Sequence, residues 1–336
     1  MKSFLSRTLS LAAVLTAAVI AVPTAVPAAA TATTPTAPTA PAVPTTVSVL
    51  AFNIYQLPRV ADGDAAGKDR RARAAETVIR SADPGVLVLE EAFSAEAESL
   101  RARLADRWPY QTPLVGQYCA TSAGWTTVTG NCSTSPLVVS GGVTVFSKYP
   151  ITQQHQLVYR NSYFPTADYY ANKGAALVRV VKDNRPIWIA GTHLQADQSP
   201  YSIATAHTTR MAQLGELRAL VAKYAPATEP VVIAGDLNIE YWAGQSRVDG
   251  QGRSQIRQAE AALSATLAET PIHPYTFDGA TNPLAATNST TTYRDVLDYI
   301  GLAVGHATPT LTPVRTLGYS AAPPSDHYPV QTTVGY

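Results

Sequence analysis

The segment PPSDHYPV, residues 323 to 330, places an aspartate directly before a histidine near the end of the chain. Asp326 and His327 introduce an apolar run, YPVQTTV, that is typical of a final strand. An ionisable pair at the mouth of a strand is well placed to transfer a proton. The same dipeptide also occurs in ordinary polar turns, so the rest of the sequence has to decide between a turn and a catalytic pair.

Short polar groups follow apolar segments at several other points of the chain. Together with the first pair, these residues are Asn53, Glu91, His193, Asp236 with Asn238, Asp298, and Asp326 with His327. Any one of them alone is typical of a turn. All of them together predict one site, because strand ends that gather at one edge of a sheet hold their side chains on rigid elements.

The chemistry that this set of side chains favours is metal-assisted hydrolysis of a phosphate ester. Carboxylate and amide oxygens are the ligands that Mg²⁺ prefers in proteins. A bound Mg²⁺ neutralises charge on a phosphate oxygen, and a histidine removes a proton from the attacking water. The sequence contains no Gly-x-Ser-x-Gly elbow, and nothing in it indicates a thiol nucleophile.

Hydrophobic periodicity predicts the elements that must position these residues. Strands are expected at residues 46–55, 85–93, 141–151, 174–181, 186–194, 230–238, 295–304 and 327–334. Helices are expected at 68–82, 202–224 and 255–269. The helix at 202–224 carries Met211, Leu214, Leu217, Leu220 and Val221 on one side. Alternation along the strand at 85–93 predicts that Glu90 faces away from Glu91, in solvent or behind the site.

The beginning of the chain has the pattern of a secretory signal peptide over residues 1–30, with a basic start, an uncharged apolar run at 9–22 and three alanines at 28–30. A retained membrane anchor is the alternative for this segment. Residues 31–46 consist mainly of Thr, Ala and Pro, which predicts an extended linker. The catalytic domain is then expected at 47–336, and the protein is expected to be secreted and extracellular.

Charge and cysteine content narrow the class of protein further. Without Lys2 and Arg7 the chain has 23 basic and 24 acidic residues, whereas proteins that grip duplex DNA usually show a basic excess. No nucleic-acid partner and no further membrane span are therefore expected. Cys119 and Cys132 are the only cysteines, and in an oxidising compartment we expect them to form one disulfide.

Eight segments follow one another in the order found in bacterial neutral sphingomyelinases, which the chain resembles from about Val47 to Val330. They are FNIY, VLVLEEAF, SGGVTVFSKYPI, NKGAALVRV, GTHLQAD, VVIAGDLN, LDYI and SDHYPV. SDH and GDLN are shared by the whole endonuclease/exonuclease/phosphatase superfamily, whereas GTHLQAD with NKG is more particular to this branch. The resemblance implies an α+β fold, a four-layer αββα sandwich of two mixed β-sheets flanked by helices, as in pancreatic-type deoxyribonuclease.

The resemblance also implies the metal and water sites. Glu91 matches the principal Mg²⁺ ligand, and Asn53 lies beside it at the metal or the phosphate. Mn²⁺ or Co²⁺ are the expected substitutes for Mg²⁺. Asp236 and Asn238 match the pair that orients water and contacts the phosphate.

Proton transfer is implied for a second group of residues. His193 matches a histidine that contacts phosphate or assists the leaving oxygen. His327 matches the general base, Asp298 the carboxylate that orients its imidazole, and Asp326 a member of the polar network on the metal side. Either His327 or Asp236 takes the proton from water, and His327 is the preferred choice.

Substrate binding is indicated less sharply. Lys173 in NKG is either a phosphate ligand or an exposed turn lysine. Tyr169 and Tyr170 belong to an aromatic stretch, YRNSYFPTADYY, whose ring faces suit a choline head group if they are not simply packed in a loop. The histidines outside the motifs are expected on the surface, and these are His155, His207, His273 and His306.

The implied activity is hydrolysis of sphingomyelin to ceramide and phosphocholine by a secreted phospholipase C-type phosphodiesterase. The alternatives are a broader phospholipase C that also cleaves phosphatidylcholine, a secreted nuclease and a non-catalytic lipid-binding module. Bacillus-type and staphylococcal relatives enter membranes with an aromatic hairpin between LDYI and SDH, but residues 302–325 here contain a single aromatic, Tyr319. Only transient contact with lipid surfaces and weak attack on intact bilayers are therefore expected, unless Trp125 or the aromatics at 159–170 replace the hairpin.

Overall fold

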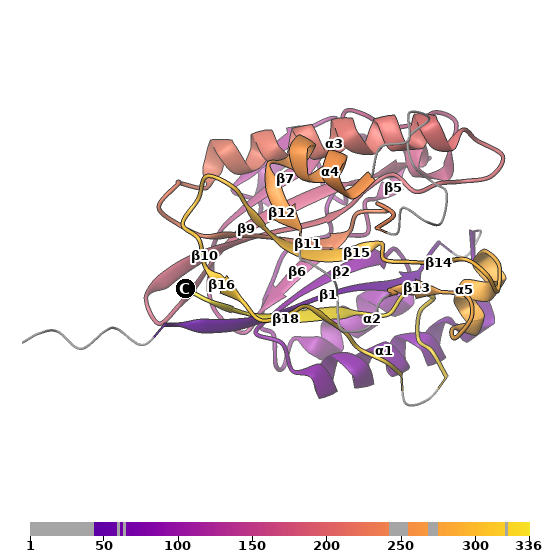
Figure 1. Cartoon of the computed structure of the whole chain (residues 1–336), viewed down its shortest axis with the longest axis horizontal. Helices are drawn as coiled ribbons and strands as arrows, with labels where there is room; N and C mark the ends of the chain where they lie inside the picture. Colours follow the sequence, from indigo (N-terminus) through magenta and orange to yellow (C-terminus); the bar gives the residue numbers. More distant parts are fainter. Residues whose placement is uncertain (1–43, 59–60, 63–64, 242–254, 268–274, 320–321) are drawn as a thin grey trace, which may run out of the picture. The chain divides into compact units, whose positions relative to one another are not determined.

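The computed structural model describes residues 44–336 apart from 59–60, 63–64, 242–254, 268–274 and 320–321. The expected signal peptide and nearly all of the expected linker lie outside the described residues. Within the described part, two seven-stranded sheets pack face to face and helices cover their outer faces (Figure 1). The four-layer αββα sandwich predicted from the sequence is confirmed.

The first sheet is built around β1 (Thr46–Gln56), which runs parallel to one neighbour and antiparallel to the other. Its order is β16 (Thr310–Leu311), β18 (Val330–Gly335), β1, β2 (Val86–Ala92), β6 (Thr144–Ser147) and β3 (Tyr110–Gln111), with β17 (Arg315–Thr316) also paired to β18. Because β1 and β2 are parallel, their carboxyl ends lie at the same edge of the sheet.

The second sheet has a parallel pair at its centre in the same way. Its order is β12 (Ala265–Leu267), β15 (Asp298–Ala303), β11 (Val231–Asp236), β10 (Arg185–His193), β9 (Gly174–Lys182), β7 (Ile151–Val158) and β4 (Thr127–Gly130). β10 and β11 are parallel, and β15 is antiparallel to β11. The first residue of β15 therefore lies beside the last residues of β10 and β11.

Helices cover the outer face of each sheet (Figure 1). They are α1 (Lys68–Ala82) and α2 (Ala95–Leu104) on the first sheet, and α3 (Ile203–Tyr224) and α4 (Gln255–Leu263) on the second. One short helix and two small strand pairs accompany these layers: α5 (Pro283–Asn288), the pair β13 (Phe277–Asp278) and β14 (Arg294–Asp295), and the pair β5 (Val139–Ser140) and β8 (Ala171–Asn172). None of the described helices combines the length and apolar composition that crossing a bilayer requires.

Alternation along β1 shows how the layers are joined. Val49 and Ala51 belong to the apolar cluster between the two sheets, whereas Leu50 and Phe52 belong to the cluster under α1 and α2. Both faces of β1 are thus buried, which explains why the sequence reads as an almost continuous apolar run. On the opposite side, Leu214 and Leu217 of α3 pack against the second sheet, as their helical spacing predicts.

Two of the predicted elements were wrong in extent. The strand expected at 141–151 is divided between the sheets, with β6 in the first and β7 in the second, and Pro150 lies at the crossing where it has no amide hydrogen to donate. The helix expected at 255–269 ends at Leu263, because Ser264 adopts a left-handed backbone (φ 55°) and residues 265–267 pair with β15. Both changes occur at backbone positions that apolar periodicity does not register.

The two cysteines are joined as the sequence predicted, in a Cys119–Cys132 disulfide that closes a loop containing β4. Closing a loop of this size stabilises a protein by about 3 kcal/mol in the chain-entropy model. We expect mass spectrometry of unreduced peptides, from protein isolated without reductant, to find Cys119 and Cys132 joined by a disulfide. Recovery of both as free thiols under non-reducing conditions would contradict this pairing.

Candidate active site

The predicted site residues lie together where the two sheets meet at one edge. Asn53, Glu91, His193 and Asp236 are at or near the carboxyl ends of β1, β2, β10 and β11. Asp298 instead begins β15, and Asp326 with His327 precedes β18. The antiparallel direction of these last two strands brings their first residues to the edge where the other strands end.

Asp236 is the centre of the hydrogen-bonded group. Its Oδ2 accepts a hydrogen bond from Asn53 Nδ2 at 3.0 Å, and its Oδ1 accepts one from the backbone amide of Asn238 at 2.9 Å. Two imidazoles approach the same Oδ2, His193 Nε2 at 3.4 Å and His327 Nε2 at 3.8 Å. A single carboxylate therefore links both histidines to β1 and β11.

His327 is oriented by Asp298 from the neighbouring strand. The distance from His327 Nδ1 to Asp298 Oδ2 is 2.8 Å, and the backbone amide of His327 donates to Ser325 Oγ at 3.0 Å. Burial lowers the pKa of His327, but the negative charges of Asp298 and Asp236 and the hydrogen bond to Asp298 outweigh it and place the pKa well above the usual value. Because Asp298 holds the proton on Nδ1, Nε2 is the atom that faces Asp236 and the cavity.

His193 has the opposite environment. Burial, followed by the nearby charge of Lys173, lowers the pKa of His193 to about 3, so this imidazole is neutral. Lys173 Nζ lies 3.1 Å from His193 Nε2 and donates to the backbone oxygen of Leu194 at 2.8 Å. Asp168 Oδ2 pairs with the same ammonium at 2.9 Å. Lys173 is therefore a buried ion-pair partner behind His193, which decides against the exposed turn lysine.

Asp326 is held by residues that the sequence did not single out. Asn288, the last residue of α5, donates its Nδ2 to Asp326 Oδ2 at 2.8 Å and accepts a hydrogen bond from the Tyr55 hydroxyl at 3.0 Å. Ser325 Oγ donates to the backbone oxygen of Asn53 at 2.6 Å. Ser325 was visible within the SDH motif, but Asn288 lies in a polar stretch that gives no signal, because only the fold brings α5 to the site.

Glu91 turns into the cavity because the strand ends irregularly. Its backbone is left-handed (φ 54°), and the pairing of β1 with β2 shifts register between Asn53 and Gln56. Burial, and after it the charge of Asp326, raises the pKa of Glu91 to about 8. Its Oε2 is buried and has no hydrogen-bond partner among the described residues. A carboxylate of this kind, beside Asp236 and Asp326, fits a divalent cation that would offset the accumulated negative charge.

A second set of residues also has a spacing compatible with a metal ion. Ligand atoms of Asp236, Asp298 and His327 all lie within 4.8 Å of one another. His327 Nδ1 and Asp298 Oδ2, however, already form a hydrogen bond of 2.8 Å with each other. We therefore interpret this trio as an oriented acid–base group. Glu91, whose Oε2 has no hydrogen-bond partner among the described residues, is the candidate metal ligand.

Glu90 was expected either in solvent or behind the site, and the structure excludes the position in solvent. The side chain is fully buried, and neither of its oxygens has a hydrogen-bond partner among the described residues. It points between the sheets like Val86 and Val88 of the same strand, toward Gly235 of β11. Burial, and after it the charges of Asp298 and Asp236, raises the pKa of Glu90 well above its usual value. The left-handed backbone of Glu91 explains why two successive glutamates both approach the site.

A change of Glu90 to glutamine tests this environment. A glutamate whose pKa is raised in the folded state contributes stability that is complete below its unfolded pKa and is lost as the pH rises. We expect Glu90→Gln, in EDTA, to lose less stability than the wild type between pH 5 and pH 8, and to melt at the same or a higher temperature at pH 8. Scanning calorimetry measures both. A variant that is less stable at every pH would show that an ionised Glu90 makes a necessary contact.

The site opens into a cavity of about 610 Å³. Its lining includes six of the predicted residues, namely Glu91, His193, Asp236, Asn238, Asp326 and His327. The segment 196–201 and the aromatic side chains of Tyr201, Phe277 and Tyr293 form other parts of the wall. Tyr169 and Tyr170 are not part of this lining, and both are exposed at the surface.

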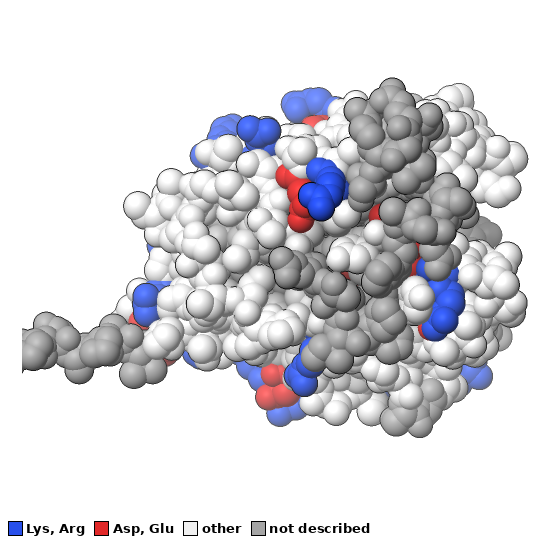
Figure 2. All heavy atoms as spheres, viewed as in Figure 1, with Lys and Arg blue, Asp and Glu red and all other residues white. Residues whose placement is uncertain are grey.

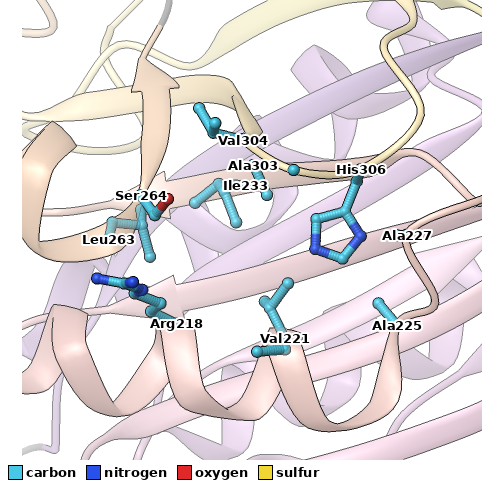
Figure 3. A pocket seen from close by; sticks show the side chains of 12 residues that line it. Arg218, Val221, Ala225, Ala227, Ile233, Leu263, Ser264, Ala303, Val304 and His306 are labelled. Carbon is cyan, nitrogen blue, oxygen red and sulfur yellow. The ribbon is translucent and has the colours of Figure 1, made fainter.

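A smaller cavity of about 320 Å³ lies at the other end of the second sheet (Figure 3). Arg218 and His306 are the ionisable side chains in its lining, and apolar residues such as Val221 and Ile233 complete it. It therefore lacks the carboxylates that metal-assisted chemistry needs.

Two of the histidines outside the motifs were expected on the surface but are buried. His155 stacks on Tyr224 with ring centroids 4.0 Å apart, and His207 lies on the inner side of α3. His273 lies outside the described residues.

The comparisons with known proteins agree with this fold and site. The family model of the Endonuclease/Exonuclease/phosphatase family matches residues 50–327. This span contains every predicted metal, catalytic and substrate-binding residue. The chain belongs to this family, as the resemblance in its motifs had indicated.

Individual similar proteins show which members of this family the chain resembles. The chain is 30% identical to the sphingomyelinase C of Leptospira interrogans over 84% of its own length and 51% of that protein, so it spans about half the length of this relative. The crystal structure of sphingomyelinase C from Streptomyces griseocarneus superposes with a TM-score of 0.75 at 31% identity, over 86% of this chain and 99% of that one. A beta toxin variant of Staphylococcus aureus, crystallised with bound magnesium ions, has a TM-score of 0.75 at 26% identity over the same shares.

Proposed function

We propose that the chain is a secreted, Mg²⁺-dependent phosphodiesterase of the phospholipase C type that hydrolyses sphingomyelin to ceramide and phosphocholine. The observation that carries the proposal is the meeting of Glu91, Asp236 and the Asp298-oriented His327 at one cavity. The names of the similar proteins support the choice of substrate. The pattern of residues 1–30 supports secretion.

Water attacks the phosphorus atom in this reaction. The water oxygen forms a new bond to phosphorus, and the bond from phosphorus to the ceramide oxygen breaks. The ceramide oxygen takes up one proton, which balances the proton that the attacking water gives up. When bound, Mg²⁺ neutralises charge on a phosphate oxygen. Glu91 would hold it, with Asn53 and Asp326 beside it.

The other site residues position water and move protons. His327 Nε2 accepts the proton of the attacking water, since its Nδ1 is committed to Asp298. Asp236 and Asn238 orient that water. His193 is neutral and faces the phosphate, and the Lys173 ammonium behind it contributes positive charge as the phosphate gains negative charge.

Aromatic side chains in the same cavity supply a wall for the head group. Phe277 and Tyr293 lie with ring centroids 5.7 Å apart and line the cavity together with Tyr201. Aromatic faces attract a quaternary ammonium such as that of choline. These rings support the head-group assignment better than Tyr169 and Tyr170, which lie outside the lining.

One assay tests the proposal. Purified protein is offered sphingomyelin in detergent micelles, phosphatidylcholine in the same micelles and plasmid DNA, each with Mg²⁺ or EDTA. Release of phosphocholine from sphingomyelin only with Mg²⁺ is expected. Equal release from phosphatidylcholine would establish the broader phospholipase C, and nicking of DNA without phosphocholine release would replace the proposal by a nuclease.

The charge distribution on the face in Figure 2 does not favour the nuclease. Its basic side chains lie in separate groups, several beside acidic ones, so the described residues of this face form no continuous basic surface for nucleic acid.

A further inference from the structure

Five of the exposed large apolar side chains lie on two neighbouring segments of the described chain. They are Leu137, Val139, Phe164, Tyr169 and Tyr170, with exposed fractions of 76%, 41%, 61%, 43% and 40%. We call these five side chains the apolar patch. The two segments are joined because β5 pairs with β8, with Val139 opposite Ala171. Apolar side chains gathered in this way on a surface mark a contact with another molecule or with lipid.

The aromatic members of the patch support one another without becoming buried. The Phe164 and Tyr169 rings lie edge to face with centroids 5.1 Å apart, and the Tyr169 and Tyr170 rings do so at 5.3 Å. The two tyrosines end a short 3₁₀ turn, Ala167–Tyr170. Such rings are amphipathic, with an apolar body and a polar hydroxyl, which suits the boundary between water and lipid.

The patch is fastened to the rim of the active-site cavity. The backbone amide of Ala167 donates to Gln198 Oε1 at 2.7 Å, and Asp168 Oδ2 accepts from the backbone amide of Ala196 at 2.7 Å. Gln198 and Ala196 both line the cavity. The aromatic side chains therefore stand on a turn whose backbone is bonded directly to the cavity wall.

The two segments that carry the patch are nearly uncharged. Residues 133–142 and 161–172 contain one charged residue, Asp168, and it is buried and paired with Lys173 at 2.9 Å. Segments without lysine or arginine contribute no electrostatic attraction to an anionic membrane. They are compatible with a zwitterionic interface such as a layer of phosphocholine head groups.

From these observations we propose that the apolar patch inserts into the head-group layer of a zwitterionic lipid interface and places the cavity over its substrate. The inference rests on the proposed function. It assigns to the patch the role for which residues 302–325 are too poor in aromatics. Trp125, the other candidate, is only 3% exposed and cannot reach an interface.

The experiment measures binding separately from catalysis. Flotation with vesicles of sphingomyelin and phosphatidylcholine, in EDTA, is compared for the wild type and for Leu137→Ser/Val139→Ser/Phe164→Ser. Tyr169→Ser/Tyr170→Ser is a second variant, tested for vesicle binding alone. The matched control, Tyr110→Ser/Val304→Ser, removes exposed apolar side chains outside the patch. Turnover of the water-soluble diester 4-nitrophenylphosphorylcholine with Mg²⁺ reports whether the cavity is intact in the first variant.

Both patch variants are expected to bind vesicles about tenfold or more weakly than the wild type, since buried apolar area supplies interfacial binding. The control should bind like the wild type, and the first variant should keep its turnover of the soluble diester. Wild-type protein that does not bind the vesicles, or patch variants that bind equally well, would overturn the inference. So would loss of soluble turnover in the first variant, or a wild-type dimer that the patch changes dissociate. Vesicle binding through the patch without any cleavage of either substrate would leave this inference standing and remove the proposed function.

Discussion

Replacing Glu91 with glutamine is expected to leave the fold intact and to remove nearly all Mg²⁺-dependent turnover. Glu91 Oε2 is buried without a partner among the described residues, and no other carboxylate at the end of β2 points into the cavity. Metal ions supply several kcal/mol of charge stabilisation in such reactions, so turnover should fall by about 10³-fold. Phosphocholine release over a range of Mg²⁺ concentrations measures this effect.

Stability provides a second readout for Glu91 that does not depend on activity. A ligand present at 100 times its dissociation constant stabilises the folded state by about 2.7 kcal/mol. Mg²⁺ should therefore raise the melting temperature of the wild type and leave that of Glu91→Gln unchanged. Glu98→Gln, on the exposed side of α2, is the matched control and should behave like the wild type. Near-native activity of Glu91→Gln at low Mg²⁺ would remove Glu91 from the metal site.

Replacing His327 with alanine is expected to lower kcat by about 10²–10⁴, the range for general acid–base groups. In the wild type, activity should fall on the acid side as His327 takes up a proton. Asp298 and Asp236 raise the pKa of His327, so this acid limb should lie at a higher pH than an ordinary histidine would give. The limb should disappear in His327→Ala. His306→Ala, at the smaller cavity, is the control histidine and should retain wild-type kcat.

The substitution Asp298→Asn separates the orientation of His327 from proton transfer. Asp298→Asn removes a negative charge next to His327, so the pKa of His327 should fall and the acid limb should move to lower pH. A reduced kcat should accompany that shift, because the imidazole loses the charged acceptor that holds the proton on Nδ1. An acid limb that is unchanged in both His327→Ala and Asp298→Asn would identify Asp236 as the base.

The fold could be predicted in outline because its signals are local. The helix at 68–82 was placed within the bounds of α1, since a charged amphipathic segment is followed by the turn residues Asp83, Pro84 and Gly85. Most long strands were found for the same reason, as their apolar runs end in polar residues. The candidate site followed from those ends, because parallel strands bring their carboxyl ends to one edge of a sheet.

The sequence could not predict the orientations and contacts that depend on how the elements pack against one another. Glu90 and Glu91 are neighbours that strict alternation would separate, and only the left-handed backbone at Glu91 brings both to the site. Asn288, which holds Asp326, comes from α5 and gives no signal in the sequence. Asp168, which pairs with Lys173, lies in the aromatic stretch at 159–170, whose pattern does not indicate an ion pair.

The aromatic stretch at 159–170 shows most clearly what the sequence determines and what only the tertiary structure decides. Composition by itself determined that this protein carries a cluster of rings with few charged neighbours, but not whether those rings are packed, bind a head group or face water. The tertiary structure decided that Tyr159 is buried under the second sheet's helix while Phe164, Tyr169 and Tyr170 remain exposed. The physical reason is that burial is a property of the packed layers: a side chain loses its water only where another element has apolar surface to cover it.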